Sequence, residues 1–313
     1  MLKYVAVAAA LKTMSAGPQM RRFYRMLGNQ AGNRRRMTGP VPGFYMDRVR
    51  RVVRLTSQHA IVRDGDRILE LGTGWLHWEA MTLRLLFDIE AVLFDVWDNR
   101  QLGGLKHYAE QLLPLLRDDL DLTPAQRSRA IPLAEKILRV ESFDELYSLL
   151  GFRYVVQPDG SLGQFADESF QLVVSGGVLE HVKRETLPRL FAESNRVLQP
   201  GGWMLHSIDT SDHLSHYDAS VCKKKYLSYS EPTWKYLFEN EVQYINRVQR
   251  CEWLALFENA GFELVEEESR QVDITGLKLA PRWAAMPPHD LASTVVRVAL
   301  RKSSRRAFPE AAQ

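Results

Sequence analysis

An acid and two glycines form the first group of residues suited to chemistry: Glu70 precedes Gly72 and Gly74, with Thr73 between the glycines and Trp75 after them. Glycine allows tight turning and close backbone approach where a nucleotide-like ligand meets a helix N-terminus. The acid could pair with a positively charged part of that ligand. No third glycine follows at the spacing that packs around a pyrophosphate, and no Gly-Lys-Ser or Gly-Lys-Thr is present to cradle a phosphate. For this motif by itself, a strand-to-helix turn without a ligand is the alternative.

Two further acids lie where a nucleoside could be held. Asp95 follows a short apolar run about 25 residues after Glu70, and an acid at this place can accept hydrogen bonds from both ribose hydroxyls. We therefore choose Asp95, with Val96 beside it. Asp98 competes for the role, and either acid could instead cap a helix. Asp159 stands in a Pro-Asp-Gly turn after the next apolar run, where it could receive an adenine amino group or serve only the turn.

A second group of polar residues is rich in histidine. Residues 206–218 contain three histidines and three aspartates, which could act as a general base, hydrogen-bond a substrate or bridge a polar loop. They could also ligate a divalent metal, but their spacing matches no established ligand pattern, so no metal is expected. His181 could take up a proton near neutral pH or be structural. The candidate catalytic residues are His181, Asp209, His213 and His216, and the candidate substrate-binding residues are Tyr217, Asn246 and Arg247.

Seven apolar or β-rich runs, separated by helical patterns, must position these residues. The runs cover residues 67–71, 91–94, 153–156, 170–174, 203–208, 262–266 and 294–300. Their alternation with helices predicts an α/β fold with a Rossmann-like, doubly wound seven-stranded sheet. Ligands of such sheets bind at the carboxyl ends of the strands, which is where the glycine turn, the acids and the histidines stand.

Two segments lie outside this rhythm. Residues 101–151, between the second and third strands, are rich in leucine and charge at helical spacing, which predicts a helical insertion that could cover a cofactor or shape a substrate pocket. Residues 1–63 hold 13 lysines and arginines against one acid, and indicate one or two helices broken at 39–43. This basic helical cap could serve an anionic substrate, a membrane surface or RNA, or pack its arginines on the acidic core domain, 64–313.

Composition places the chain among ordinary globular proteins. Its 313 residues, 45% hydrophobic and 25% charged, can bury one full α/β core. No apolar run approaches the roughly 20 residues that span a bilayer, so membrane contact would be peripheral, through the basic segment. Two cysteines, Cys222 and Cys251, give no disulfide framework and fit a reducing cytoplasm. A homo-oligomer stays open.

The segment 167–182 is the most discriminating stretch, with a strand followed by Ser175 and by Leu-Glu-His at 179–181. Together with Glu-x-Gly-x-Gly at 70–74, the two nucleoside acids and Arg-Val-Leu-Gln-Pro-Gly-Gly at 196–202, it closely resembles the class I S-adenosylmethionine-dependent methyltransferases of the generic bacterial, small-molecule type. Two positions depart from that pattern: Leu76 stands where many members have a further glycine, and Gln171 where aspartate is usual.

The resemblance implies that S-adenosylmethionine is the cofactor and S-adenosylhomocysteine the product. The residues that it implies for the cofactor, with their immediate neighbours, are Glu70, Gly72, Thr73, Gly74, Trp75, Asp95, Val96, Asp159 and Ser175. Methyl transfer is an in-line displacement, so alignment and water exclusion matter most, and a base is needed only if the acceptor loses a proton.

We expect a small-molecule acceptor with a hydroxyl, amine or carbon nucleophile, which could be anionic or lipid-linked. An RNA methyltransferase that uses the arginine-rich segment is one alternative, although no RNA-binding module is recognisable and nucleic acid is the less favoured partner. A non-catalytic cofactor-binding protein or partner subunit is the other. Intact cofactor motifs at 70–74 and 95 argue against it.

Overall fold

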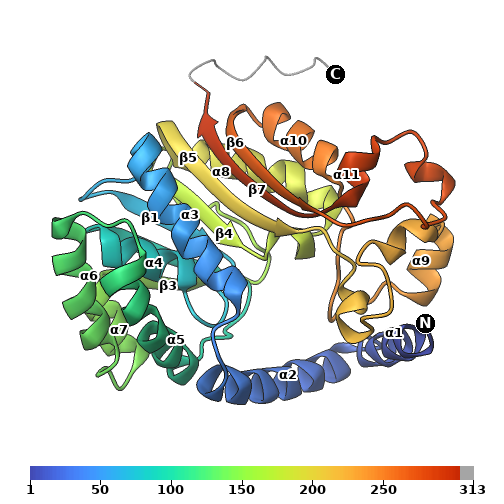
Figure 1. The fold of residues 1–313 in the computed structure, drawn as a ribbon, viewed down its shortest axis with the longest axis horizontal. Helices are drawn as coiled ribbons and strands as arrows, with labels where there is room; N and C mark the ends of the chain where they lie inside the picture. Colours follow the sequence, from blue (N-terminus) through green and yellow to red (C-terminus); the bar gives the residue numbers. More distant parts are fainter. Residues whose placement is uncertain (304–313) are drawn as a thin grey trace.

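A seven-stranded sheet with the order β3-β2-β1-β4-β5-β7-β6 organises the computed structural model, which describes residues 1–303 (Figure 1). Strands β1 to β5 are parallel, whereas β7 runs antiparallel to both β5 and β6. The predicted α/β, doubly wound sheet is confirmed. The strands are β1 Arg67–Leu71, β2 Glu90–Asp95, β3 Phe152–Val156, β4 Phe170–Gly176, β5 Leu198–Asp209, β6 Phe262–Gln271 and β7 Ser293–Lys302.

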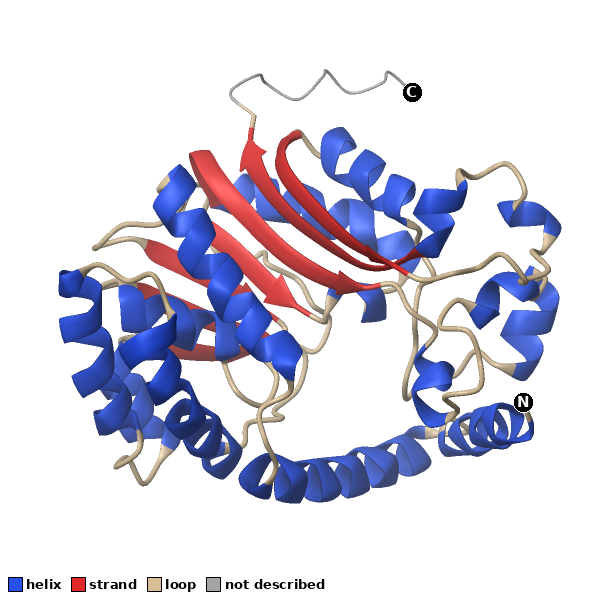
Figure 2. Cartoon of the chain, viewed as in Figure 1, coloured by secondary structure: helices blue, strands red, loops and turns tan. Residues whose placement is uncertain are grey.

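The strand order reverses between β1 and β4, which is the place where open parallel sheets bind ligands. Both strands are buried on nearly every residue because helices cover both faces of the sheet (Figure 2). The other helices and short helical turns are α4 Trp78–Leu86, η2 Leu179–His181, η3 Arg184–Thr186, α8 Leu187–Val197, η4 His213–Tyr217, η5 Lys225–Ser228, α9 Glu231–Leu237, α10 Arg250–Asn259, η6 Pro281–Trp283 and α11 Pro288–Ala292.

The predicted helical insertion between β2 and β3 consists of α5 Leu102–Pro114, a π-helical turn η1 Leu115–Asp119, α6 Pro124–Ile137 and α7 Phe143–Leu150. Thr123 caps α6 through a reciprocal capping box with Gln126, and Gly151 ends α7 in the left-handed region at φ 69°. Side chains of these helices share one hydrophobic core with α3 and α4. The final residues of the predicted 64–313 core domain, 304–313, lie outside the described residues.

The N-terminal segment forms three helices, α1 Leu2–Met14, α2 Pro18–Thr38 and α3 Gly43–His59, which corrects the expected one or two. The break at 39–43 was expected, but a second one falls at 15–17, where Gly17 is extended and Pro18 begins the next helix. Helix α1 lies against η4 and α2 against α5, so the pair passes below the ends of the strands in Figure 1. No helix among the described residues is long and apolar enough to cross a membrane.

Candidate cofactor and acceptor site

The turn after β1 is built by two glycines in the left-handed region, Gly72 at φ 62° and Gly74 at φ 57°. A Cβ on Gly72 would stand 2.5 Å from Cγ1 of Val178, so the turn packs closely on the segment that follows β4. The backbone N–H of Thr73 donates to the Phe94 carbonyl at the end of β2. The turn is thereby fixed between the ends of three strands.

Asp95 is joined to this turn by direct hydrogen bonds. Its buried carboxylate accepts from the backbone N–H of Gly74 at 2.9 Å and from that of Val96 at 2.7 Å. Burial raises the pKa of Asp95, and these backbone donors partly offset the rise. Asp98 instead pairs with Arg100 at 2.6 Å on the exposed side. Of the two competing acids, Asp95 is the one placed against the glycine turn.

Glu70 forms a buried acidic pair with a residue that the sequence did not single out, Glu79 of α4. Burial and the neighbouring Glu79 raise the pKa of Glu70, whose carboxylate accepts from the Ala80 N–H at 3.2 Å. Arg48, from α3, lies 2.8 Å from the Glu79 carboxylate. A Cβ on Gly176, at the end of β4, would collide with the guanidinium of Arg48. Arg48 therefore reaches the switch point of the sheet, although composition marked it only as part of a basic segment.

Trp75 and Thr73 connect the turn to its surroundings. The Trp75 indole N–H donates to the side-chain oxygen of Asn29 in α2 at 3.1 Å, and the Arg36 guanidinium lies 3.9 Å from the indole centroid. The Thr73 hydroxyl lies 2.7 Å from Nδ1 of His77, a buried side chain. Trp75 itself stays 37% exposed, although α2 contacts its ring.

Two predicted cofactor residues, Asp159 and Ser175, form their hydrogen bonds with residues outside the turn after β1. Asp159 is exposed after β3, where its carboxylate accepts from the Gln157 amide and from the Ser161 backbone N–H, both at 2.9 Å. Ser175 is buried in β4, and its hydroxyl lies 2.7 Å from Nδ1 of His206 in the adjacent strand β5. The Ser175 hydroxyl is thus engaged within the sheet.

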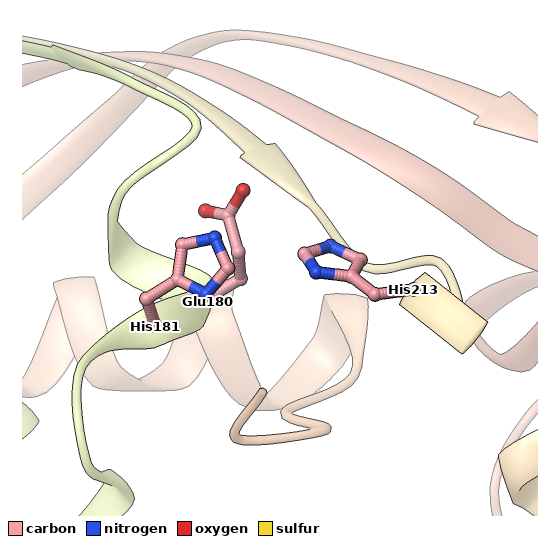
Figure 3. Close-up of side chains that lie close together, drawn as sticks. All are labelled: Glu180, His181 and His213. Atoms are coloured by element: carbon pink, nitrogen blue, oxygen red, sulfur yellow. The ribbon is translucent and has the colours of Figure 1, made fainter. Parts of the chain in front are cut away.

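The four candidate catalytic residues gather at the ends of β4 and β5. Rings of His181 and His213 have centroids 5.1 Å apart, and those of His213 and His216 are 5.2 Å apart. Asp209 lies 3.6 Å from Nε2 of His213, and this contact outweighs burial and raises the pKa of the histidine. Glu180 lies close to His181 and His213, as Figure 3 shows, although the sequence analysis assigned no role to it.

Glu180 is 3% exposed, and burial, with the nearby Asp209, raises its pKa to about 8. Its signal in the sequence was only the Leu-Glu-His block, which contributed to the resemblance to class I methyltransferases and assigned no chemistry to Glu180.

The three predicted substrate residues have different surroundings. Asn246 is buried and its amide donates to the carbonyls of Leu179 and Val182, at 2.8 and 3.0 Å, so it clamps the backbone of η2. Arg247 donates to both carboxylate oxygens of Glu231 at 2.7 Å, which balances its charge. Tyr217 lies at the surface of η4.

The Gln243 side-chain amide donates to the Tyr217 hydroxyl at 2.7 Å and to the Tyr24 hydroxyl of α2 at 2.7 Å. One amide therefore joins the second N-terminal helix to the segment that follows β5.

An open, mainly parallel sheet with a glycine turn and a buried acid at its switch point defines an α/β protein that binds a nucleoside-type cofactor. Residues 41–267 match the methyltransferase domain family, and the chain belongs to this family. It is a methyltransferase, and its cofactor is S-adenosylmethionine.

Solved structures of similar shape include an S-adenosylmethionine-dependent methyltransferase from Methanosarcina mazei. The two sequences are 15% identical, and the matched region covers 78% of this chain and 96% of that one, with a TM-score of 0.45. Another is phosphoethanolamine N-methyltransferase 2 of Haemonchus contortus in complex with S-adenosylmethionine. It is 14% identical and covers 81% of this chain and 52% of that one, with a TM-score of 0.44. A search of curated protein sequences found no match.

Proposed function

We propose that the protein transfers the methyl group of S-adenosylmethionine to a small-molecule acceptor bound at the ends of β4 and β5. The cofactor would lie against the ends of β1, β2 and β4, in contact with Glu70, Gly72, Thr73, Gly74, Trp75, Asp95, Val96, Asp159 and Ser175. When bound, it supplies an electrophilic methyl group on a positively charged sulfur.

The charges of the site fit this cofactor. Glu70 and Glu79 are two buried carboxylates. One guanidinium, that of Arg48, pairs with Glu79. A cationic ammonium or sulfonium group nearby would lower the raised pKa of Glu70 and stabilise its charged form. Each carboxylate oxygen of Asp95 accepts one backbone hydrogen bond, from Gly74 or from Val96. Each oxygen has a further lone pair that could accept from a ribose hydroxyl.

At the acceptor end, the chain's own residues would orient the nucleophile and move its proton. Asp209 holds His213, and His216 lies beside them with Nε2 3.2 Å from the Ser211 hydroxyl. Burial and the neighbouring His213 lower the pKa of His216, so its ring is neutral and can accept a proton at neutral pH. His181 borders the same space. An acceptor hydroxyl or amine would lose its proton here as it forms a bond to the methyl carbon.

The observation that carries the small-molecule assignment is the Gln243 amide, which ties Tyr24 of α2 to Tyr217 of η4 across the acceptor end. Such a connection, next to His216 in the sequence, would limit the size of an acceptor that reaches the histidines.

The RNA alternative depends on free arginines in the N-terminal segment, yet several are used internally. Arg54 pairs with Glu266 and Glu268 at 2.5 and 2.6 Å, Arg48 pairs with Glu79, and Arg51 is buried. Each internal ion pair removes a cation from RNA binding, which favours the small-molecule acceptor.

Isotope-labelled S-adenosylmethionine and a fractionated extract test the proposal. We expect label in a small molecule of the filtrate that separates from S-adenosylmethionine by chromatography. Asp95→Ala should yield much less of this product, because the variant should weaken S-adenosylhomocysteine binding more than about tenfold in calorimetry. Asp98→Ala is the matched control and should bind as the wild type does. Label in RNA or protein, with none in the filtrate, would overturn the small-molecule acceptor.

A further inference from the structure

Three side chains at the acceptor end have the chemistry of metal ligands. Glu180 and His181 belong to η2 after β4, and His213 belongs to η4 after β5. One ring nitrogen of each histidine and one carboxylate oxygen of Glu180 all lie within 4.8 Å of one another. Figure 3 shows the three side chains converging from these two segments. Ligand atoms of a tetrahedral ion with bonds of about 2.0–2.1 Å are about 3.4 Å apart, so side-chain rotations that bring the three atoms slightly closer would close the group around one ion.

A second, independent observation is a buried polar atom without a partner in this group. The Oε2 atom of Glu180 is inaccessible to solvent and has no hydrogen-bond donor among the described residues, on a residue that is 3% exposed. A buried carboxylate oxygen without a donor or a cation is costly. A bound cation would remove that cost.

His181 is held in the way that metal-bound histidines usually are. Its Nδ1 lies 2.7 Å from the Tyr244 carbonyl oxygen, which can only accept, so Nδ1 carries the hydrogen and Nε2 presents its lone pair. Nε2 of His213 is buried, lies 3.6 Å from the Asp209 carboxylate and has no hydrogen-bond partner among the described residues. The ring of His213 is therefore not committed to a hydrogen bond through that nitrogen.

The backbone and the charges around the group agree with this arrangement. Asn246 donates from its backbone N–H to the Glu180 carbonyl at 2.9 Å and clamps η2 through its amide, so Glu180 and His181 are fixed relative to β4. Within residues 1–303, neither Glu180 nor Asp209 forms an ion pair with a lysine or arginine. Two acidic groups therefore lie close together, and a bound divalent cation would favour the charged form of the Glu180 carboxylate.

We propose that Glu180, His181 and His213 bind a divalent transition-metal ion of the zinc type, and that its open coordination positions take an oxygen atom of the methyl acceptor. Two imidazoles and one carboxylate suit zinc, whereas magnesium and calcium favour oxygen ligands alone. His181 is exposed, so an acceptor can reach the ion from that side. The acceptor contact rests on the proposed function, whereas ion binding does not.

Calorimetric titration of zinc into the metal-free full chain tests ion binding. We expect one equivalent to bind, and cobalt, used in its place, to develop visible absorption bands. Glu180→Gln and His213→Ala should each weaken zinc binding more than about 100-fold, since even partners outside the coordination sphere cost 10–100-fold. His289→Ala removes an exposed histidine next to Asp290 and is the matched control, with unchanged binding expected.

Thermal melting of the metal-free variants checks that they fold. Glu180→Gln keeps the shape of the side chain and places no charge in this buried position, so the metal-free variant should melt no lower than the wild type. Zinc binding that is absent from the wild type, or unchanged in both ligand variants, would overturn the site, as would binding of magnesium in preference to zinc. S-adenosylhomocysteine binding is measured on the same metal-free samples, so failure of the cofactor site and failure of the metal site are seen separately.

Discussion

The two glycines of the turn after β1 share a left-handed backbone but differ in their surroundings. A Cβ at Gly72 meets Val178 at 2.5 Å, whereas the nearest atom to a Cβ at Gly74 is the Gly72 carbonyl oxygen at 3.7 Å. The first glycine is therefore required by packing in the protein itself. The second leaves open the space in which we propose the cofactor lies.

Alanine at each position should separate these two requirements. Left-handed backbone costs an L-residue about 1–2 kcal/mol, and overpacking a further 1–3 kcal/mol, so Gly72→Ala should lower the free energy of unfolding by about 2–5 kcal/mol. Gly74→Ala should cost only about 1–2 kcal/mol and yet weaken S-adenosylhomocysteine binding more than about tenfold. Urea denaturation and calorimetry measure both quantities. Equal loss of stability in the two variants would contradict the packing argument.

At this scale the sequence could predict residues whose role depends on neighbours along the chain. Asp95 directly ends an apolar run, and in the structure it accepts a hydrogen bond from the Gly74 N–H, whereas its contact with the cofactor stays a prediction. Arg48 and Glu180 were missed for one physical reason: each acts with partners from other segments. Arg48 reaches Glu79 from a separate helix, and Glu180 meets His213 about thirty residues further along.

The segment that follows β5 is fixed by one buried lysine. Nζ of Lys224 donates to the carbonyls of Thr210 and Ser293, at 2.9 and 2.8 Å, and to the Gln249 side-chain oxygen at 2.9 Å. It also lies 2.8 Å from the Tyr226 hydroxyl. One ammonium group thereby joins the end of β5, the start of β7 and the start of α10.

Replacing this lysine should loosen the whole segment. Lys224→Met leaves the Gln249 oxygen without that donor and removes two bonds to carbonyls, so the free energy of unfolding should fall by about 2–4 kcal/mol. Urea denaturation measures the loss. Lys223→Met, at the exposed neighbouring position, is the matched control and should change stability by less than about 0.5 kcal/mol.

The same lysine should give stability a pH dependence. Burial lowers the pKa of Lys224 to about 7 from the ordinary 10.5, so between these values the unfolded chain holds a proton that the folded chain has lost. Unfolding then takes up a proton, and the free energy of unfolding rises with pH. The stability of the wild type relative to Lys224→Met should increase from about pH 7 to about pH 9.5. A constant difference across this interval would contradict the shift.

Element boundaries were predictable where both faces of a strand are buried. The predicted run 67–71 coincides with β1, whose residues are almost all buried. The prediction 262–266 covered only half of β6, which extends to Gln271. Strand β6 is an edge strand with mostly exposed or half-buried residues, so its Glu-rich second half carries no apolar pattern. Pairing with β7, which the sequence does not display, is what keeps it extended.

Over the whole molecule, the basic N-terminal segment divides into helices that differ in how deeply they are buried. Helix α3 buries six residues and belongs to the main core, whereas α2 has no buried residue. Contacts that tie α2 to the site include Asn29 to Trp75, Arg36 to Gln101 and Tyr24 to Gln243. The charge asymmetry of the sequence predicted a basic cap. It could not show that α2 packs on α5, because these two helices lie far apart in the chain.

Hydrogen exchange should reveal α2 as a segment that opens easily and closes on the cofactor. Few buried contacts mean a low free energy of local opening, so its amides should exchange faster than those of α3 in the free protein. S-adenosylhomocysteine at the turn would stabilise Trp75, and through Asn29 it should slow exchange in α2 at least about tenfold, with little change in α6. The variant Asn29→Ala should lose part of this protection while retaining that of β1. Equal exchange in α2 and α3, or protection confined to the strands, would show that α2 does not respond to the cofactor.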